Sequence, residues 1–263
     1  MTRTFETESL SVRYGGLVAL DDVSIRIEPG EFAGLIGPNG AGKTTFIDAV
    51  TGFTTASGRI TLGSTAILPL APHARVRAGL SRTFQSLELF EDLTIRENVL
   101  VATERGRWWS PIAEMIRPKA SGELSETVEE VLELVGLTGH TEAYPPDLSL
   151  GQRKLVSVAR ALASRPSLLL LDEPAAGLDS DASLELGREL KRIAERGISI
   201  LLVDHDMDLV LEVCERINVL NFGKLIASGT TSDVQSDPTV VAAYLGTNEE
   251  PDDGSQNSTG LAS

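Results

Sequence analysis

The chain carries Gly37-Pro38-Asn39-Gly40-Ala41-Gly42-Lys43-Thr44-Thr45, which matches the pattern G-x-x-x-x-G-K-[ST] of a phosphate-binding loop. The apolar run at 32–36 predicts a buried strand before it, and residues 45–50 predict the first turns of a helix after it. Glycines let backbone N–H groups approach phosphate oxygens, and a helix N-terminus favours anionic charge. We therefore expect Lys43 to reach the β- and γ-phosphates of a nucleoside triphosphate, and the Thr44 hydroxyl to ligate Mg²⁺.

The composition is ordinary for a globular α/β protein of the cytoplasm. The chain has 263 residues, of which 41% are hydrophobic, and it contains no apolar run of about 18 residues and no apolar stretch typical of a signal peptide near Met1. Its one cysteine, Cys214, excludes an internal disulfide and a cysteine-rich metal site, and we expect it in the core. A net charge of −15 argues against nucleic acid as the main partner.

The order of apolar patterns predicts an α/β fold with a mostly parallel central sheet. Alternating stretches at 5–12, 23–27 and 59–62 predict a β-rich N-terminal part. Residues 94–164 read as mostly helical, with Thr94 and Glu97 as a capping box and a helix at 123–135. The apolar runs at 167–171 and 198–203 fit central strands that are covered on both faces, with a helix at 183–195 between them. Residues 247–263 predict a disordered acidic and polar tail.

Three of the predicted strands end in residues that carry chemistry. The first leads into the phosphate loop, the second into Asp172-Glu173 and the third into His205. Because ligands gather at the carboxyl ends of parallel strands, we expect these groups to converge. Asp172 can hold Mg²⁺, Glu173 can act as general base on the attacking water, and His205 can contact the γ-phosphate. The alternatives are a surface turn for Asp172-Glu173 and an ordinary surface or core histidine for His205.

Two interpretations fit Leu148-Ser149-Leu150-Gly151-Gln152, which lies just before a predicted helix. Ser149 is well suited to be the N-cap of that helix. The hydroxyl of Ser149 and the free amides of the first turn would also form a second anion site.

Together these motifs resemble the nucleotide-binding subunit of ATP-binding-cassette (ABC) transporters, over roughly residues 5–246. The phosphate loop resembles Walker A, residues 167–174 resemble Walker B with Glu173 as the catalytic glutamate, and residues 177–179 resemble the D-loop. His205 matches the position of the family's switch histidine. The resemblance also implies a role for Gln85 as the Q-loop glutamine in catalysis and Mg²⁺ binding, and it implies that Tyr14 stacks on adenine.

Residues 148–152 resemble the family signature Leu-Ser-Gly-Gly-Gln, with one departure at Leu150. Leucine limits close backbone approach and positive φ, so a reduced ATPase rate is one expectation. An unchanged rate in Leu150→Gly would show that the substitution is harmless.

The resemblance implies an assembly as well as a reaction. Two cassettes pair head to tail, and Ser149, Gly151 and Gln152 of one subunit face the ATP bound by the other. The second cassette would be an identical or a different chain. Membrane permease subunits and, indirectly, an extracytoplasmic substrate-binding protein would be further partners, which places the chain peripherally on the inner face of the cell membrane.

Several local stretches resemble the branched-chain amino-acid uptake group, above all Ala175-Ala176-Gly177-Leu178 and Tyr244-Leu245-Gly246. An importer of urea or another amide would look much alike. A non-transport cassette ATPase that acts on nucleic acid or ribosomes is the alternative in another class, and a small-molecule kinase would leave the signature unexplained. Trp108 and Trp109 fit a subdomain core better than an interface with the membrane subunit.

Overall fold

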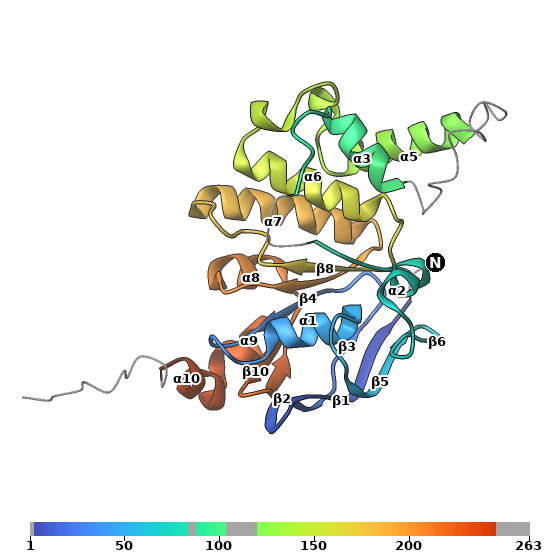
Figure 1. Cartoon of the computed structure of the whole chain (residues 1–263). Coiled ribbons are helices and arrows are strands. Elements are labelled where there is room, and N and C mark those ends of the chain that lie inside the picture. Colours follow the sequence, from blue (N-terminus) through green and yellow to red (C-terminus); the bar gives the residue numbers. More distant parts are fainter. Residues whose placement is uncertain (1–2, 84–87, 104–119, 246–263) are drawn as a thin grey trace, which may run out of the picture.

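The computed structural model describes residues 3–83, 88–103 and 120–245 (Figure 1). A six-stranded sheet runs in the order β11-β10-β4-β9-β8-β7 through the middle of the molecule. All neighbouring strands in it are parallel except β11 against β10 at one edge. Its strands are β4 Phe32–Ile36, β7 Leu80–Arg82, β8 Leu168–Asp172, β9 Ser199–Val203, β10 Arg216–Asn221 and β11 Lys224–Gly229.

The central strands are mostly apolar, as expected for a sheet that is covered on both faces. Every residue of β4, β8 and β9 is buried. Leu169 and Leu171 of β8 pack into the core on one face, and Leu168 and Leu170 pack into the core on the other. This confirms the predicted parallel sheet and leaves polar residues only where the strands end.

A second, antiparallel sheet is built from the N-terminal part of the chain. Its order is β2-β1-β5-β6, and β3 also pairs with β1. Its strands are β1 Phe5–Tyr14, β2 Leu17–Val23, β3 Arg26–Ile27, β5 Ser57–Leu62 and β6 Thr65–Ala66.

The strand predicted over 23–27 is divided into β2 and β3, and this boundary was wrong. The buried Thr7 hydroxyl accepts the N–H of Ile25 at 2.9 Å and donates to the Val23 carbonyl at 3.2 Å. The hydroxyl thus replaces two of the backbone partners at this point, while Thr7 N still donates to the Ile25 carbonyl at 2.8 Å, and the chain leaves β2 and pairs again as β3.

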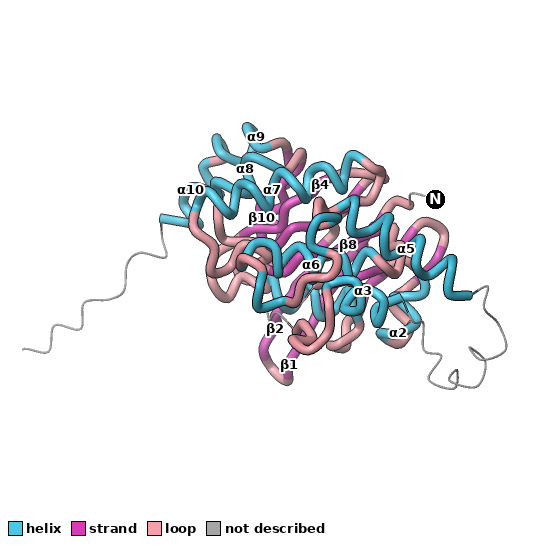
Figure 2. Tube along the Cα trace, turned by 90° about the horizontal axis from the view of Figure 1, so that it is seen from above, coloured by secondary structure: helices cyan, strands magenta, loops and turns pink. Residues whose placement is uncertain are grey.

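Helices cover the two faces of the central sheet (Figures 1 and 2). On one side lie α3, α5, α6, α7 and α8, and on the other lie α1 and the antiparallel sheet (Figure 1). The helices are α1 Lys43–Thr51, α2 Pro72–Ala78, α3 Ile95–Thr103, α5 Ala120–Leu134, α6 Leu150–Leu162, α7 Ser180–Glu195, α8 Met207–Val213, α9 Thr231–Ser236 and α10 Pro238–Leu245, with short 3₁₀ turns at Thr138–His140 and Pro145–Asp147.

The predicted helical part of the chain is confirmed where it is described. Thr94 N donates to Glu97 Oε2 at 2.8 Å and Glu97 N donates to Thr94 Oγ1 at 3.2 Å, which is the predicted capping box before α3. Cys214 is buried, as predicted. Gln85, Trp108, Trp109 and the predicted tail 247–263 lie outside the described residues. Within 3–83, 88–103 and 120–245, no helix has the length and hydropathy that a membrane span requires.

Candidate active site

The phosphate loop joins the end of β4 to the start of α1, and two of its glycines are required by close contacts. A Cβ on Gly37 would lie 2.2 Å from the Leu220 carbonyl oxygen, and a Cβ on Gly42 would lie 2.9 Å from that of Ala19. Gly42 also has a φ of 105° as the residue that precedes α1. The loop can therefore take its shape against β2 and β10 only with glycine at these positions.

Lys43 lies in the first turn of α1 and is only 8% exposed. Its Nζ donates to the Gly37 carbonyl at 2.6 Å and to the Pro38 carbonyl at 3.1 Å, so it lies across the loop. Burial lowers the pKa of Lys43, while three nearby carboxylates, those of Glu173, Asp172 and Asp204, oppose that shift. The predicted convergence of the loop with Asp172-Glu173 is confirmed.

Asp172 ends β8 and is held by Arg82 of the neighbouring strand β7. Arg82 Nη2 donates to Asp172 Oδ2 at 2.8 Å, and Arg82 Nη1 donates to Asp48 Oδ1 of α1 at 2.7 Å. All three side chains are at most one-third exposed. Arg82 therefore ties together the helix after the phosphate loop, the strand that leads toward Gln85, and the carboxylate predicted to hold Mg²⁺.

The donor set fits a hard cation such as Mg²⁺. One carboxylate oxygen of Asp172 is oriented by Arg82. Thr44 is an exposed residue in the first turn of α1, so its hydroxyl is a second possible oxygen ligand. The described residues contain no group of three or more His, Cys, Asp or Glu side chains suited to a metal. A cation here would therefore take few protein ligands and complete its shell from phosphate and water, as Mg²⁺ does beside nucleotides.

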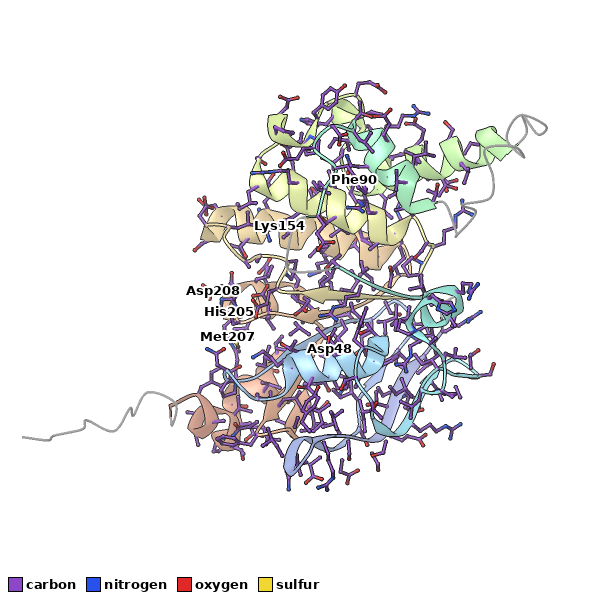
Figure 3. All side chains as sticks on the ribbon, in the orientation of Figure 1. Asp48, Phe90, Lys154, His205, Met207 and Asp208 are labelled. Carbon is purple, nitrogen blue, oxygen red and sulfur yellow. The ribbon has the colours of Figure 1, made fainter. Side chains whose placement is uncertain are left out.

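Glu173 and His205 face each other across the ends of β8 and β9. Glu173 has a left-handed backbone (φ 47°), and its N–H donates to the Val203 carbonyl at 2.7 Å. A non-glycine residue held in this region is strained and is characteristic of functional sites. Glu173 Oε1 lies 3.8 Å from His205 Nδ1, and the His205 side chain is 66% exposed and open to a ligand (Figure 3).

Asp204 is a residue of this site that the sequence reasoning did not assign. It is 1% exposed, and its Oδ1 accepts the N–H of His205 at 2.8 Å. Burial raises its pKa, while hydrogen bonds from the backbone of Asp206, His205 and Ala175 oppose that shift. Its one sequence signal is a carboxylate directly after an apolar strand, the same signal that marks Asp172.

The predicted N-cap at Ser149 is confirmed. Ser149 Oγ accepts the N–H of Gln152 at 3.2 Å, and Gln152 Oε1 accepts the N–H of Ser149 at 3.0 Å, a capping box that opens α6. Leu150 does not have a positive φ, and its Cδ2 lies 3.7 Å from the place of a Cβ on Gly177. The backbone conflict expected at Leu150 is therefore absent here, and its effect on hydrolysis stays a prediction.

Residues 149–152 and 177–179 line a common cavity of about 490 Å³ to which the loop 37–45 contributes no residue. In the described part of the chain, no hydrogen bond or ion pair joins residues 148–152 to that loop. The two predicted halves of a nucleotide site thus lie apart within one chain.

Comparison with known proteins agrees with this geometry. Residues 20–176 match the family described as ABC transporter, and residues 224–250 match the family described as branched-chain amino acid ATP-binding cassette transporter. The chain belongs to the ABC transporter family of ATP-binding subunits. As such it is an ATPase.

Among curated proteins, the ABC ATPase is 36% identical to the high-affinity branched-chain amino acid transport ATP-binding protein BraF of Pseudomonas aeruginosa, over 92% of this chain and 97% of BraF. It is 35% identical to LivG of Escherichia coli, over 90% and 95% of the two chains. It is also 35% identical to the lipopolysaccharide export system ATP-binding protein LptB of Acidithiobacillus ferridurans, over 94% and 98%.

Solved structures show the same architecture. The ADP conformation of MJ1267, an ATP-binding cassette of an ABC transporter, has a TM-score of 0.81 and 31% identity, over 94% of this chain and all of that one. A nucleotide-free ATP-binding cassette has a TM-score of 0.78 and 31% identity, over 92% and 99%.

Tyr14 closes β1 and is 50% exposed, directly before the turn into β2. An exposed ring is available for stacking, and the contact of Tyr14 with adenine stays a prediction.

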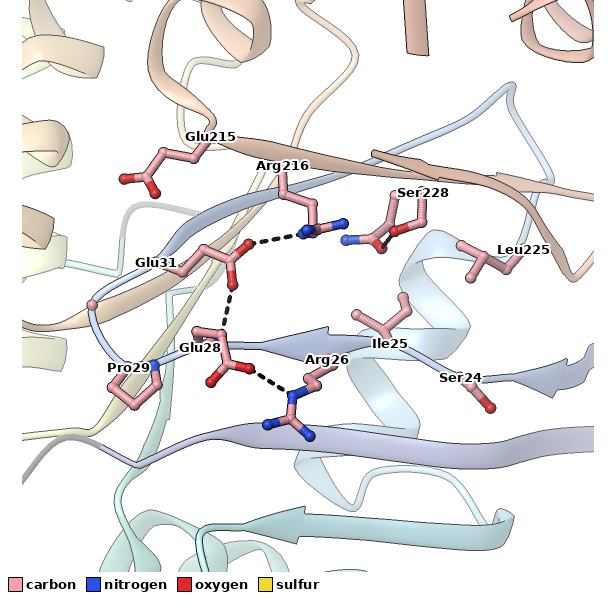
Figure 4. Close-up of a pocket in the computed structure, with 12 residues that line it drawn as sticks. Ser24, Ile25, Arg26, Glu28, Pro29, Glu31, Glu215, Arg216, Leu225 and Ser228 are labelled. Atoms are coloured by element: carbon pink, nitrogen blue, oxygen red, sulfur yellow. Dashed lines mark hydrogen bonds and ion pairs between the residues drawn. The ribbon is translucent and has the colours of Figure 1, made fainter. Parts of the chain in front are cut away.

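A larger cavity of about 600 Å³ lies at the opposite end of the ABC ATPase (Figure 4). It is formed near the starts of β4 and β10, so it is remote from the strand ends that carry Asp172 and His205. Its arginines already have carboxylate partners: Arg216 Nε lies 3.3 Å from Glu31 Oε1, and Arg26 Nε lies 2.6 Å from Glu28 Oε1. We assign this cavity no part in ATP hydrolysis.

Proposed function

We propose that the chain powers an ABC importer for branched-chain or related amino acids. The substrate class is inferred from the match of residues 224–250 to the branched-chain amino acid ATP-binding cassette transporter family. The names of BraF and LivG support it. Whole-chain identity alone does not set direction or substrate, because LptB, named for lipopolysaccharide export, is as similar as LivG.

In this proposal, different residues of the chain have different roles in ATP hydrolysis. The loop amides and Lys43 bind the phosphates, and Glu173 takes a proton from the attacking water. His205 contacts the γ-phosphate, and Gln85 contributes to catalysis. Thr44 and Asp172, together with Gln85, would hold Mg²⁺, which neutralises the charge that develops on the phosphates. Arg82 keeps the Asp172 carboxylate in a fixed orientation.

We further propose that a second cassette completes the site. The separation of residues 148–152 from the phosphate loop within one chain supports this arrangement. Ser149, Gly151 and Gln152 of one subunit would then cap the γ-phosphate bound by the other. ATP closes the pair, hydrolysis opens it, and permease subunits on the inner face of the cell membrane receive the motion.

Uptake measurements in the organism test the substrate class. We expect deletion of the gene to abolish uptake of radiolabelled leucine, isoleucine and valine, and the wild-type gene to restore it. Glu173→Gln, which keeps ATP binding but lacks the general base, should not restore it. Loss of urea uptake with normal branched-chain uptake would contradict the assignment. Cofractionation with ribosomes instead of membranes would contradict transport altogether.

A further inference from the structure

The side chain of Gln152 makes two polar contacts on opposite sides of its amide group. Its Oε1 accepts the N–H of Ser149 at 3.0 Å, as half of the capping box that opens α6. Because the carbonyl oxygen is turned toward Ser149, the NH₂ group is turned the other way, where Nε2 of Gln152 lies 3.1 Å from Nε2 of His140. The signature residues 148–152 are therefore connected to a histidine that lies twelve residues before Gln152.

The capping boxes before α3 and α9 show why this glutamine has use for a second partner. In those boxes the corresponding side chains are Glu97 and Asp233, whose ionised carboxylates only accept hydrogen bonds. Gln152 is a half-buried amide, and its donor hydrogens remain after its oxygen has capped the helix. His140 supplies an acceptor for one of them, which avoids the cost of a donor shielded from water without a partner.

This contact determines which nitrogen of His140 carries the proton. The amide N–H can only donate, so Nε2 of His140 accepts, and the proton of the neutral ring lies on Nδ1. Nδ1 is buried, and no hydrogen-bond partner for it lies within the described residues. The one acceptor that the ring offers is thus directed at Gln152.

The turn that carries His140 is anchored to a neighbouring helix. The Ala143 carbonyl accepts the N–H of Ile95 at 2.9 Å, and the Thr141 carbonyl accepts the N–H of Arg96 at 3.0 Å, both in the first turn of α3. The backbone on the C-terminal side of His140 is therefore fixed to α3, and the imidazole extends from this support to the side chain of Gln152.

We propose that His140 is a positioning residue of the signature: its Nε2 accepts the Gln152 amide and holds the capping box of α6 in the shape that meets the nucleotide of a second cassette. The inference rests on the proposed pairing of two cassettes. Ser149, at the other end of the same box, is exposed, as a residue that faces a partner must be. His140 acts through Gln152 and Ser149 and is not itself a catalytic residue.

The test compares two variants of similar size, His140→Gln and His140→Met, in the full-length Glu173→Gln protein. Glutamine can place an oxygen near the position of Nε2, whereas methionine has only a weakly accepting sulfur. Sedimentation with ATP and Mg²⁺ over a range of protein concentrations gives the dissociation constant of the ATP-bound pair. We expect His140→Met to raise it by about two- to ten-fold for each copy of the residue in the pair, the effect of one hydrogen bond. His140→Gln should restore most of this loss.

The affinity of the unpaired chain for a fluorescent ATP analogue is measured in parallel. It should stay within about two-fold in both variants, because the phosphate loop is untouched. His73→Met replaces an exposed histidine of α2 and should leave the pair as tight as before. Where His140→Met does not fold by circular dichroism, His140→Asn, which is too short to reach Gln152, replaces it with the same expectation.

A double-mutant cycle with Gln152 distinguishes positioning from local damage to the turn. Gln152→Met alone should weaken the pair at least as much as His140→Met. Adding His140→Met to Gln152→Met should cause no further loss, because the contact between the two side chains is already gone.

A pair as tight in His140→Met as in the protein with His140, equal losses in His140→Met and His140→Gln, or losses that multiply in the double variant would each overturn the inference. If the Glu173→Gln protein with His140 intact forms no ATP-dependent pair, either alone or with a second cassette of its transporter, the proposed pairing itself fails. Since this protein is measured first, the two failures are distinguished.

Discussion

At the scale of single residues, Arg82 orients the carboxylate of Asp172, which we propose as a ligand of Mg²⁺. It donates to Asp172 and to Asp48 at 2.8 and 2.7 Å, so the Asp172 carboxylate is oriented before any ligand arrives. Partners that orient a ligating carboxylate in this way are a large part of the affinity of a metal site.

Replacing Arg82 with methionine should therefore weaken the response to Mg²⁺ more than the binding of nucleotide. We expect the Mg²⁺ concentration for half-maximal ATPase to rise by about 10- to 100-fold. Arg59→Met is the matched control, because Arg59 is an exposed residue of β5 that pairs with Glu8 far from the site. Mg²⁺ titrations of the ATPase rate decide the matter, and superimposable curves for the two variants would refute the role of Arg82.

The residues of the site that sequence reasoning predicted are those that follow a recognisable local pattern. Asp172, Glu173 and His205 follow apolar runs, and Lys43 belongs to the loop that follows a third run; parallel strands bring such ends together. Arg82 was missed because its partners, Asp48 and Asp172, lie far away in the sequence. Asp204 carried the same signal as Asp172, a carboxylate after an apolar run, but its hydrogen bonds to the backbone of His205 and Asp206 depend on the local fold.

At the scale of helices and strands, the two interpretations of Ser149, as a helix N-cap only or also as part of an anion site, can be distinguished by comparing it with a second N-cap residue. Ser149 and Thr230 open α6 and α9 with the same reciprocal capping box. Substituting alanine for either residue should cost about 1 kcal/mol of unfolding free energy. Thr230→Ala should leave the ATPase rate unchanged, whereas Ser149→Ala should also lower it, because the hydroxyl faces nucleotide in the proposed pair. Urea unfolding and ATPase rates check both parts, and equal rates would favour a purely structural cap.

The strands that were predicted most accurately are the central ones, which other elements of the fold cover on both faces. The runs at 32–36, 167–171 and 198–203 are mostly apolar and correspond to β4, β8 and β9. The division between β2 and β3 could not be predicted, since it depends on a hydroxyl from Thr7, which lies 18 residues before Ile25. Local alternation carries no information about such a contact.

At the scale of the whole molecule, buried lysines make stability depend on pH. The pKa of Lys154 is lowered from 10.5, mainly by burial. Between the lowered value and 10.5 the unfolded chain binds more protons at this residue than the folded chain, so this residue makes the unfolding free energy rise with pH. Burial raises the pKa values of Cys214 and Tyr244. Above the ordinary pKa of each residue the folded chain therefore binds more protons than the unfolded chain, so these two residues make the unfolding free energy fall with pH. The unfolding free energy of the wild type minus that of Lys154→Met should therefore increase as pH approaches 10.5. Urea titrations at stepped pH measure it, and a constant difference would contradict it.

The central claim is that one chain holds two separate halves of a nucleotide site, which only a second cassette completes. The most direct measurement is the mass of Glu173→Gln in solution by light scattering, with ATP and Mg²⁺, with ADP, and without nucleotide. We predict twice the mass of one chain with ATP only, and the mass of one chain when Lys43→Ala is added to block binding. A Glu173→Gln variant that binds ATP tightly yet keeps the mass of one chain, both alone and when co-expressed with a second cassette of its transporter, would contradict the claim.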